Sequence, residues 1–255
     1  FYYTTNGGDF MSSSTWSETF GFLNATTENI CNWNNGDPEI APKGLWCDSA
    51  KTKVERLFFS KNNLVGVIPE EIGMLTDLQY LLVAENRLGS TLPESLFALS
   101  NLKGLDVNIN TFTGMLPSTF EEATSLEVLH LGSNALKGPI SFDRLVESVA
   151  CPLQLVVLAG NSFDGTFPLE RIATNCKDMT GININDCGVV VEGSLPTLGL
   201  EKLTVLDLTK TNLEGSIPDE ISRLRYLQQL KADYNFLTGT LPASLGELQY
   251  LTDLS

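Results

Sequence analysis

The chain has 255 residues, of which 42% are hydrophobic and 18% are charged, a composition that can bury a core and excludes a disordered chain. Its 31 acidic and 16 basic residues give a net charge of -15, which argues against nucleic acid or anionic lipid as a partner, because Lys and Arg bind both. No apolar run approaches the roughly 20 residues that span a bilayer, so we expect any membrane attachment to lie elsewhere in a longer parent protein.

Residues 1–53 carry no internal repeat. The chain starts at Phe1 without an initiator Met or a signal peptide, which is typical of a processed or trimmed fragment. We predict that Trp16, Trp33 and Trp46 form a small core in this region, with a sugar-binding role as the alternative. The one N-glycosylation sequon of the chain begins at Asn24.

From residue 54 the sequence repeats with a period close to 24 residues. The repeat is marked by Asn62, Asn86, Asn110, Asn134, Asn161 and Asn235, with Cys187 and Thr211 at the two remaining positions. Upstream of each marker lie two apolar residues separated by one other, such as Leu81 and Val83, which predicts a short strand with both side chains on one face. Downstream of most markers comes a proline, and apolar residues then recur every third position, as in a 3₁₀ turn.

One coil of strand, turn and short helical arc cannot bury its own apolar residues, whereas stacked coils bury them against each other. We therefore predict an N-terminal capping region at 1–53, which closes the first coil, and a solenoid at 54–255. The solenoid would contain eight repeats and part of a ninth, and we expect the parent protein to continue beyond Ser255. The asparagines are expected to form a structural ladder, because a side-chain amide can pair backbone groups that the bend leaves free.

The repeat reads VERLFFSKNNLVGVIP at 54–69 and LTVLDLTKTNLEGSIP at 203–218. It resembles the plant-type leucine-rich repeats of receptor-like kinase and receptor-like protein ectodomains and of polygalacturonase-inhibiting proteins; similar repeats occur in algae and stramenopiles. The resemblance implies an α/β solenoid: a capped right-handed superhelix with a concave parallel β-sheet, a second row of strands, and short helical or 3₁₀ convex arcs. Two local departures are Ser90, which replaces a glycine, and GPIS in the fourth repeat, which replaces G-x-I-P.

The same resemblance extends to the N-terminal segments GGDFMSSSTW and ICNWNNGDPEIAPKGLWCD, and it implies a cap disulfide between Cys31 and Cys47. Cys151 and Cys176 occupy similar places in two neighbouring long arcs. Adjacent coils stack about 4.8 Å apart, which a disulfide can bridge, so we predict that these two cysteines are paired. Cys187 faces inward and is expected to be free and inert. Two disulfides and a sequon indicate an extracellular protein, secreted or on the cell surface.

We predict no enzyme and no cofactor. His130 is the only histidine, and no serine or cysteine nucleophile has a second histidine to act with. Oxygen ligands for calcium are spread over five coils, which favours ordinary solvated residues over a metal site. These ligands would be Asp106, Asn108, Asn183, Asn185, Asp186, Asp207 and Asp233.

The concave sheet should present two columns of outward residues, which we take as the candidate ligand-binding surface. The first is Phe58, Leu82, Asp106, His130, Val157, Asn183, Asp207 and Lys231. The second is Arg56, Tyr80, Gly104, Val128, Leu155, Gly181, Val205 and Gln229. Phe58, Tyr80 and Leu82 would form one apolar cluster, and Val128, Leu155 and Val157 a second. Exposed apolar clusters on a rigid sheet are candidate contact sites, although glycans, the parent protein or neighbouring molecules could equally cover them.

The resulting hypothesis is an extracellular recognition module that binds a protein, peptide or polysaccharide and is part of a receptor or adhesion protein. The alternatives are a secreted inhibitor of an extracellular hydrolase and a structural protein of the cell surface or wall. The sequence leaves the identity of the ligand and the oligomeric state open.

Overall fold

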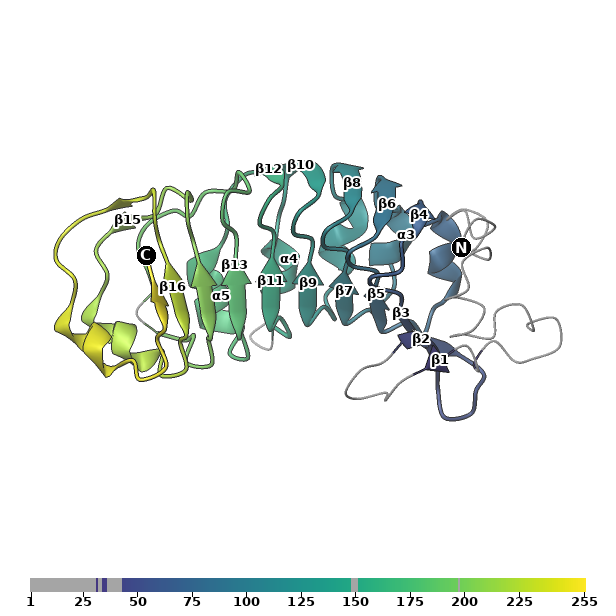
Figure 1. Cartoon of the computed structure of the whole chain (residues 1–255), viewed down its shortest axis with the longest axis horizontal. Helices are drawn as coiled ribbons and strands as arrows, with labels where there is room; N and C mark the ends of the chain where they lie inside the picture. Colours follow the sequence, from purple (N-terminus) through teal and green to yellow (C-terminus); the bar gives the residue numbers. More distant parts are fainter. Residues whose placement is uncertain (1–30, 32–33, 36–42, 148–150, 197) are drawn as a thin grey trace.

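The structure is a computed structural model that describes residue 31 and residues 34–35, 43–147, 151–196 and 198–255. Trp16, Trp33 and the sequon at Asn24 lie outside the described residues. Within these ranges the chain forms an elongated curved coil, with strands along one side and short helices along the other (Figure 1). Every helix of the described part is too short or too polar to cross a membrane.

An 11-stranded sheet runs the length of the molecule and forms its concave side. In spatial order its strands are β1 (Asn34–Asn35), β2 (Lys43–Cys47), β3 (Val54–Phe58), β5 (Tyr80–Leu82), β7 (Gly104–Asp106), β9 (Val128–His130), β11 (Leu155–Val157), β13 (Gly181–Asn183), β14 (Val205–Asp207), β16 (Gln229–Lys231) and β18 (Asp253–Leu254). The strands from β3 onward are parallel, and each begins one coil, so β3 opens coil one and β18 opens coil nine.

The register of these strands follows the repeat. Leu57 lies opposite Leu81, Leu81 opposite Leu105 and Leu105 opposite Leu129, and the pairing continues through Val156 to Leu230. The predicted strands and their alignment are therefore confirmed. At the N-terminal end β2 adds antiparallel to β3, and β1 adds antiparallel to β2, so these two strands supply hydrogen-bond partners to the first coil of the solenoid.

A second row of short parallel strands lies beside the concave sheet, as the resemblance implies. Five of them pair in one sheet: β4 (Val65–Gly66), β6 (Arg87–Ser90), β8 (Thr111–Gly114), β10 (Ala135–Pro139) and β12 (Ser162–Asp164). A separate pair consists of β15 (Glu214–Gly215) and β17 (Phe236–Leu237). Between the two groups, an isolated bridge from Thr166 to Val190 joins coil five to coil six. Backbone hydrogen bonds from the N–H of Val191 to the Thr211 carbonyl and from the N–H of Glu214 to the Gly193 carbonyl join coil six to coil seven.

The convex side consists of short helical arcs. Four are 3₁₀ turns, as predicted: η3 (Glu70–Met74), η4 (Ser118–Glu122), η5 (Asp219–Arg223) and η6 (Ala243–Glu247). Three are α-helical: α3 (Glu94–Phe97), α4 (Asp143–Val146) and α5 (Leu169–Asn175). The arcs of coils four and five contain the extra residues that distinguish their sequences, and α5 is the longest helix described.

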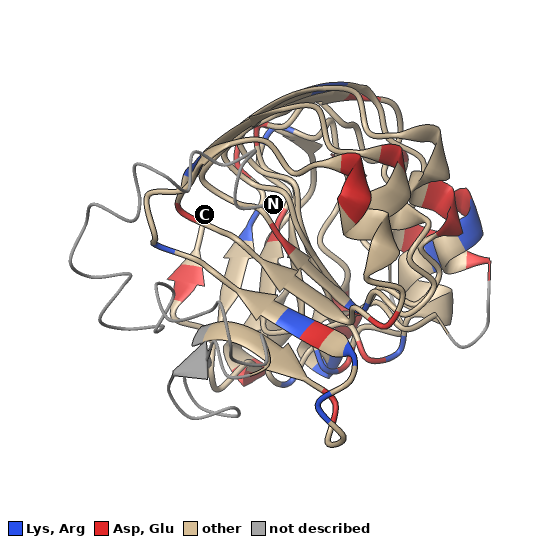
Figure 2. Ribbon diagram, turned by 90° about the vertical axis from the view of Figure 1, so that its right-hand side faces the viewer, with Lys and Arg blue, Asp and Glu red and all other residues tan. Residues whose placement is uncertain are grey.

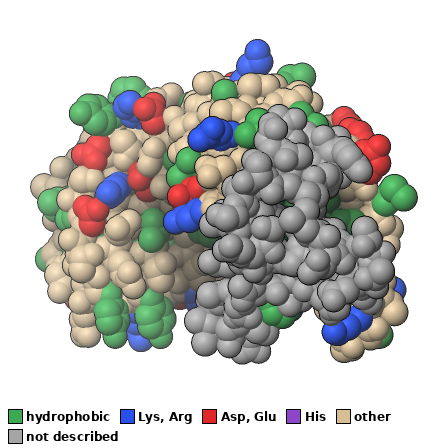
Figure 3. Space-filling model, turned by 45° about the vertical axis from the view of Figure 1, so that its right-hand side comes forward, with side chains coloured by type: hydrophobic (Ala, Val, Ile, Leu, Met, Phe, Trp, Pro, Cys, Tyr) green, Lys and Arg blue, Asp and Glu red, His purple; other side chains and the backbone are tan. Residues whose placement is uncertain are grey.

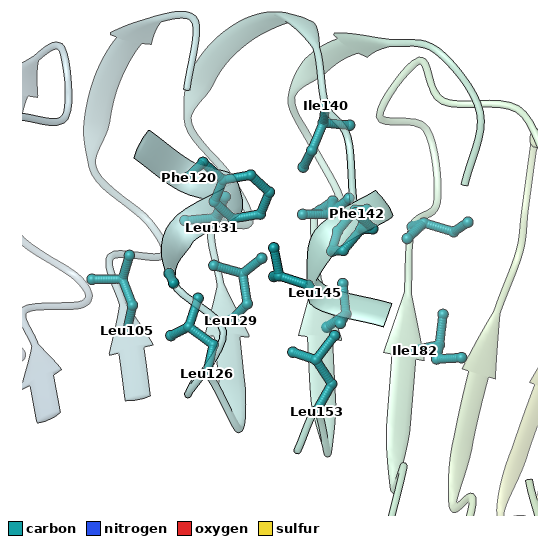
Figure 4. Close-up of a cluster of buried hydrophobic side chains, with 14 of the residues drawn as sticks. Leu105, Phe120, Leu126, Leu129, Leu131, Ile140, Phe142, Leu145, Leu153 and Ile182 are labelled. Carbon is teal, nitrogen blue, oxygen red and sulfur yellow. The ribbon is translucent and has the colours of Figure 1, made fainter. Parts of the chain in front are cut away.

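The core is a continuous column between the strands and the arcs. Leu105, Leu129 and Ile182 point inward from the concave strands, and Phe120 and Phe142 meet them from the convex side (Figure 4). The phenylalanines Phe97, Phe120, Phe142 and Phe167 form a row of edge-on ring contacts through coils two to five, with successive centroids 5.3, 5.8 and 5.3 Å apart. Sequence reasoning missed this row, because its members sit at slightly different offsets from their prolines.

The described residues contain two disulfides. Cys31 is bonded to Cys47, and Cys151 to Cys176, while Cys187 is free and buried. The second bond joins the arcs of coils four and five, with the two Cα atoms 4.6 Å apart. It therefore links neighbouring coils on the convex side, where no strand pairing is present to hold them.

The ladder asparagines pair the backbone of one coil with that of the next. The amide of Asn86 donates to the carbonyls of Val83 and Ala84 in its own coil and of Phe59 in the preceding coil. Its oxygen accepts hydrogen bonds from the backbone N–H groups of Asn62 and Leu64. One buried side chain thus satisfies backbone groups on both sides of a coil boundary.

Candidate functional site

The first outward column is present on the concave face, with one residue per coil. Leu82, Asp106, His130, Val157, Asn183 and Lys231 are half-buried between their neighbours. They alternate with the fully buried inward residues, because successive side chains of a strand point to opposite faces. Their strands are hydrogen-bonded on both sides, so the spacing between the side chains is fixed.

Two members of this column are not exposed, which corrects the sequence analysis. Phe58 is only 9% exposed. It lies between Gly44 of β2 and Leu82 of β5, so a strand from the N-terminal region lies beside it, which the sequence analysis did not take into account. Asp207 is 7% exposed. Its carboxylate accepts hydrogen bonds from the Asn185 amide at 2.7 Å and from the backbone N–H of Thr209 at 3.2 Å, so these contacts occupy it.

The proposed aromatic cluster at β3 and β5 is therefore reduced to Tyr80 and Leu82. The ring of Tyr80 lies against Gly104 of the next coil, where an added Cβ atom would come within 2.5 Å of the ring. On the other side the Arg56 guanidinium carbon lies 5.7 Å from the ring centroid, within cation–π distance. Tyr80 is therefore half-buried, with Gly104 and Arg56 as its neighbours on the sheet.

The second apolar group comes together as predicted. Leu155 pairs in register with Val128, and Val157 with His130, on the adjacent strands β9 and β11. Leu155 leans toward Gly181 and Val157 toward Gly132, where added Cβ atoms would lie 2.7 and 3.2 Å from them. The small residues leave room for the larger ones, so Val128, Leu155 and Val157 form a continuous half-buried surface, which we call the central apolar patch.

A polar pair borders this patch. His130 Nδ1 lies 3.5 Å from Asp106 Oδ1, on the neighbouring strands β9 and β7. Burial lowers the pKa of His130, while the nearby Asp106 carboxylate opposes that change. Asp106 also accepts hydrogen bonds from the backbone N–H and the side-chain amide of Asn108. The histidine therefore favours its neutral form and can donate or accept a hydrogen bond from a ligand at neutral pH.

This pair predicts a specific pH dependence. Because the pKa of His130 is lower in the folded state than its ordinary value of 6.5, the unfolded chain takes up the proton first as the pH falls. We expect this histidine to reduce the free energy of unfolding as the pH falls through 6.5 toward the lowered folded value, and to have no effect above 6.5. Urea unfolding at several pH values should show that His130→Gln removes this dependence. Identical pH profiles for the two proteins would contradict it.

Lysines at the concave strands and their flanks are paired with acids from adjacent coils. The pairs are Lys61–Glu85 at 3.0 Å, Lys103–Glu127 at 3.2 Å, Lys210–Asp186 at 2.9 Å and Lys231–Asp253 at 2.8 Å. In Figure 3, basic and acidic side chains likewise lie next to one another, with small separate groups of hydrophobic side chains between them. Many of the acidic residues gather instead on the convex arcs (Figure 2). The concave face is thus electrostatically mixed, and its apolar groups are set among paired charges.

The described residues contain no group of three or more His, Cys, Asp or Glu side chains arranged to hold a metal ion. The carboxylate of Asp207 is paired with Asn185, and that of Asp186 with Lys210. Asn183 accepts a hydrogen bond from the backbone N–H of Asn185 at 3.3 Å. The side-chain oxygen atoms of Asp207, Asp186 and Asn183, which were considered as calcium ligands, therefore have other partners here.

Exposed aromatic residues near the C-terminal end were missed by sequence reasoning. Tyr226 and Tyr250 occupy the same position in successive coils and stack with ring centroids 6.4 Å apart. Tyr234 and Phe236 flank the ladder residue of coil eight and are 80% and 62% exposed. Comparing equivalent positions outside the two strand columns would have found these residues, because the other coils carry mostly polar side chains or glycine there.

Comparisons with known proteins agree with this architecture. Residues 76–136 and 202–224 match family descriptions of the leucine-rich repeat. The solved structure "Plant peptide hormone receptor RGFR1 in complex with RGF2" is 29% identical, with a TM-score of 0.64 over 78% of this chain. The ectodomain of the Arabidopsis thaliana membrane receptor kinase GASSHO1/SCHENGEN3, solved with CASPARIAN STRIP INTEGRITY FACTOR 2, is also 29% identical, with a TM-score of 0.57 over 73% of this chain.

The Arabidopsis receptor kinase HAESA, solved with the peptide hormone IDA and the co-receptor SERK1, matches 95% of this chain at 24% identity, with a TM-score of 0.72, and supports the fold alone. This chain covers 31% of the RGFR1 chain, 25% of the GASSHO1/SCHENGEN3 chain and 39% of the HAESA chain. No curated protein sequence matches it. The chain is a leucine-rich-repeat solenoid similar in structure to the ectodomains of plant receptor kinases.

Proposed function

We propose that this chain is the ligand-binding part of an extracellular receptor or adhesion protein, and that its concave face binds a protein or peptide. The observation that carries the proposal is the central apolar patch of Val128, Leu155 and Val157, bordered by His130 and Asp106. A half-buried apolar surface with a polar border is the usual composition of a protein contact site. The hydrogen-bonded sheet beneath it limits the conformational entropy that binding would remove.

The similar structures supply a second line of support. RGFR1 is described as a plant peptide hormone receptor, and the GASSHO1/SCHENGEN3 ectodomain was solved in complex with CASPARIAN STRIP INTEGRITY FACTOR 2. An extracellular location accords with the two disulfides, which persist in oxidising compartments. In this proposal residues 1–53 cap a solenoid formed by residues 54–255, and the described strands β1 and β2 are part of that cap.

The proposal is tested by measuring which extracellular molecules bind the chain and where. Immobilised chain would be exposed to panels of secreted peptides, extracellular proteins and cell-wall oligosaccharides. For a protein or peptide that binds, we expect the double variant Leu155→Ala with Val157→Ala to weaken binding roughly hundredfold, because truncated contact residues at the centre of an interface carry most of its free energy. Calorimetry would give the two dissociation constants.

Met74→Ala is the matched control, because Met74 is an apolar residue on the convex arc η3 and is 78% exposed. Its binding should equal that of the wild-type chain. A weaker interaction in the Met74 variant, or an unchanged one in the concave double variant, would place the contact elsewhere. Binding of oligosaccharides alone would favour a polysaccharide ligand, and inhibition of a wall-degrading hydrolase would favour the inhibitor alternative.

A further inference from the structure

The asparagine ladder has a gap of two coils. Cross-coil bonds from the ladder amides to the carbonyl of the preceding coil are Asn86–Phe59 at 2.9 Å, Asn110–Val83 at 3.0 Å, Asn134–Val107 at 3.0 Å, Asn161–Leu131 at 3.0 Å and Asn235–Leu208 at 2.8 Å. In coil six Cys187 Sγ donates to the Ile184 carbonyl, and in coil seven the Thr211 hydroxyl donates to the Leu208 carbonyl. Both of these bonds stay within their own coil. The Thr211 hydroxyl also reaches the Asn235 amide oxygen of coil eight at 3.4 Å, but neither side chain donates to a carbonyl of the preceding coil as the ladder amides do.

The oxygen side of the ladder is interrupted at the same place. Asn110 and Asn134 accept hydrogen bonds from the backbone N–H groups of Leu88 and Phe112 in the preceding coils, and Asn161 does the same for Leu136. The next such acceptor along the chain is Asn235, which receives the N–H groups of Thr211 and Leu213. Within the described residues, coil six is therefore joined to coils five and seven without a ladder amide on either side, while the Asn185 amide donates to the Asp207 carboxylate of coil seven.

Three other links between coils end at coil five. The five-stranded second sheet ends at β12. The edge-on phenylalanine row ends at Phe167, and the disulfide Cys151–Cys176 joins coils four and five. Coils seven and eight have their own short pair, β15 with β17. The concave sheet and the leucine core do continue through coil six, since β13 pairs with both β11 and β14.

Where the bridging amide is missing, the backbone of coil six lies very close to coil five. A Cβ atom added to Gly188 would lie 2.0 Å from the Phe163 carbonyl oxygen, and one added to Gly199 would lie 1.8 Å from the Ala173 carbonyl oxygen. Both glycines have positive φ, at 91° and 101°. The backbone of coil six therefore departs from the regular repeat at these two glycines, where it approaches coil five closely.

We propose that the solenoid unfolds in two stages: coils six to nine unfold together, up to a boundary at the Cys187 position, before coils one to five unfold. In a repeat protein, stability is a sum of coil terms and nearest-neighbour terms, so the block whose coils are joined by the weaker links unfolds first. The N-terminal block keeps its continuous ladder, its second sheet, its phenylalanine row and both disulfides. Asn183 and Asp207 lie on the C-terminal side of this junction, so opening would remove them from the concave columns.

Cys187 reports on this opening because it is free and fully buried at the junction. Burial raises the pKa of its thiol to about 11, so the closed state reacts slowly with thiol reagents. The experiment labels the intact, disulfide-bonded chain with a thiol reagent over a series of urea concentrations, and follows global unfolding by circular dichroism in parallel. We expect labelling in native conditions, with a urea dependence much shallower than that of global unfolding, because opening four coils exposes less surface than unfolding the chain.

Two variants separate this proposal from a uniform loosening of the solenoid. Thr211→Asn restores a bridging amide in coil seven and leaves the thiol in place, so it should slow the labelling of Cys187 on the order of tenfold. Asn134→Thr creates an equivalent gap within coils one to five. It should lower the free energy of global unfolding, and it should leave unchanged the rate at which Cys187 is labelled when coils six to nine open. Labelling that follows global unfolding at every urea concentration would overturn the proposal, and so would equal effects of the two variants.

Hydrogen exchange provides a second measurement that needs no substitution. The amides of β14 and β16 should exchange together and faster than those of β5, β7 and β9, although all five strands belong to one sheet. Uniform protection along the sheet would contradict two-stage opening. This measurement decides the question even if the Thr211→Asn variant fails to fold.

Discussion

Asn86→Ala is expected to lower the free energy of unfolding by about 3–5 kcal/mol, since it leaves several buried backbone groups without partners. The side chain is 9% exposed. It donates to the carbonyls of Phe59, Val83 and Ala84 and accepts from two backbone N–H groups of coil one. Alanine replaces none of these bonds, and water has little access to the site. Urea unfolding monitored by circular dichroism would give the midpoint and the slope for both proteins.

Asn62→Ala is the matched control, because Asn62 occupies the same position of the repeat in coil one. Within the described residues its amide donates one hydrogen bond, to the Ser60 carbonyl at 2.9 Å. We expect a loss of about 1 kcal/mol for this variant. Equal losses at the two positions would show that the ladder bonds contribute nothing specific, and that the asparagines act only as turn residues.

Leu105→Ala is expected to destabilise the chain by about 2–5 kcal/mol, because a buried leucine loses both its transfer free energy and its packing contacts. Leu105 is 0% exposed and points from β7 into the core at the middle of the solenoid (Figure 4). The neighbouring variant Asp106→Ala should lose only about 1 kcal/mol, the contribution of its bonds from Asn108. Equal losses of stability in the two variants, measured by thermal or urea unfolding, would contradict the strand register.

The regular parts of the fold could be predicted from the sequence because the period imposes them. Leu57 and Leu81 stand 24 residues apart, and they lie opposite each other in the structure. The second row of strands follows from the motif L-x-G-x-I-P and from the family resemblance. The choice between 3₁₀ and α-helical arcs was less predictable, because a spacing of three also fits one turn of α-helix. The arc α3 is such a case.

The candidate site was less predictable than the fold, because exposure depends on neighbours that a single repeat does not contain. Phe58 holds the same position as Leu82, yet β2 of the cap lies beside it and it is buried. Asp207 matches Asp106 in the repeat, and the amide of Asn185 in the adjacent coil six covers it. Glycines at equivalent positions make room for different side chains: Gly104 for Tyr80, and Gly181 for Leu155. These are contacts between coils, and periodicity alone does not specify them.

Hydroxyl-radical footprinting of the chain, free and bound to a ligand selected from the panels, tests the central claim most directly, because it measures the solvent exposure of individual side chains. The account predicts that the ligand protects Leu155, Val157 and His130 on the concave strands β9 and β11. It also predicts unchanged oxidation of Met74 and Met115, which are 78% and 60% exposed and lie outside the concave sheet. Protection of the two methionines, with the central apolar patch unprotected, would contradict it.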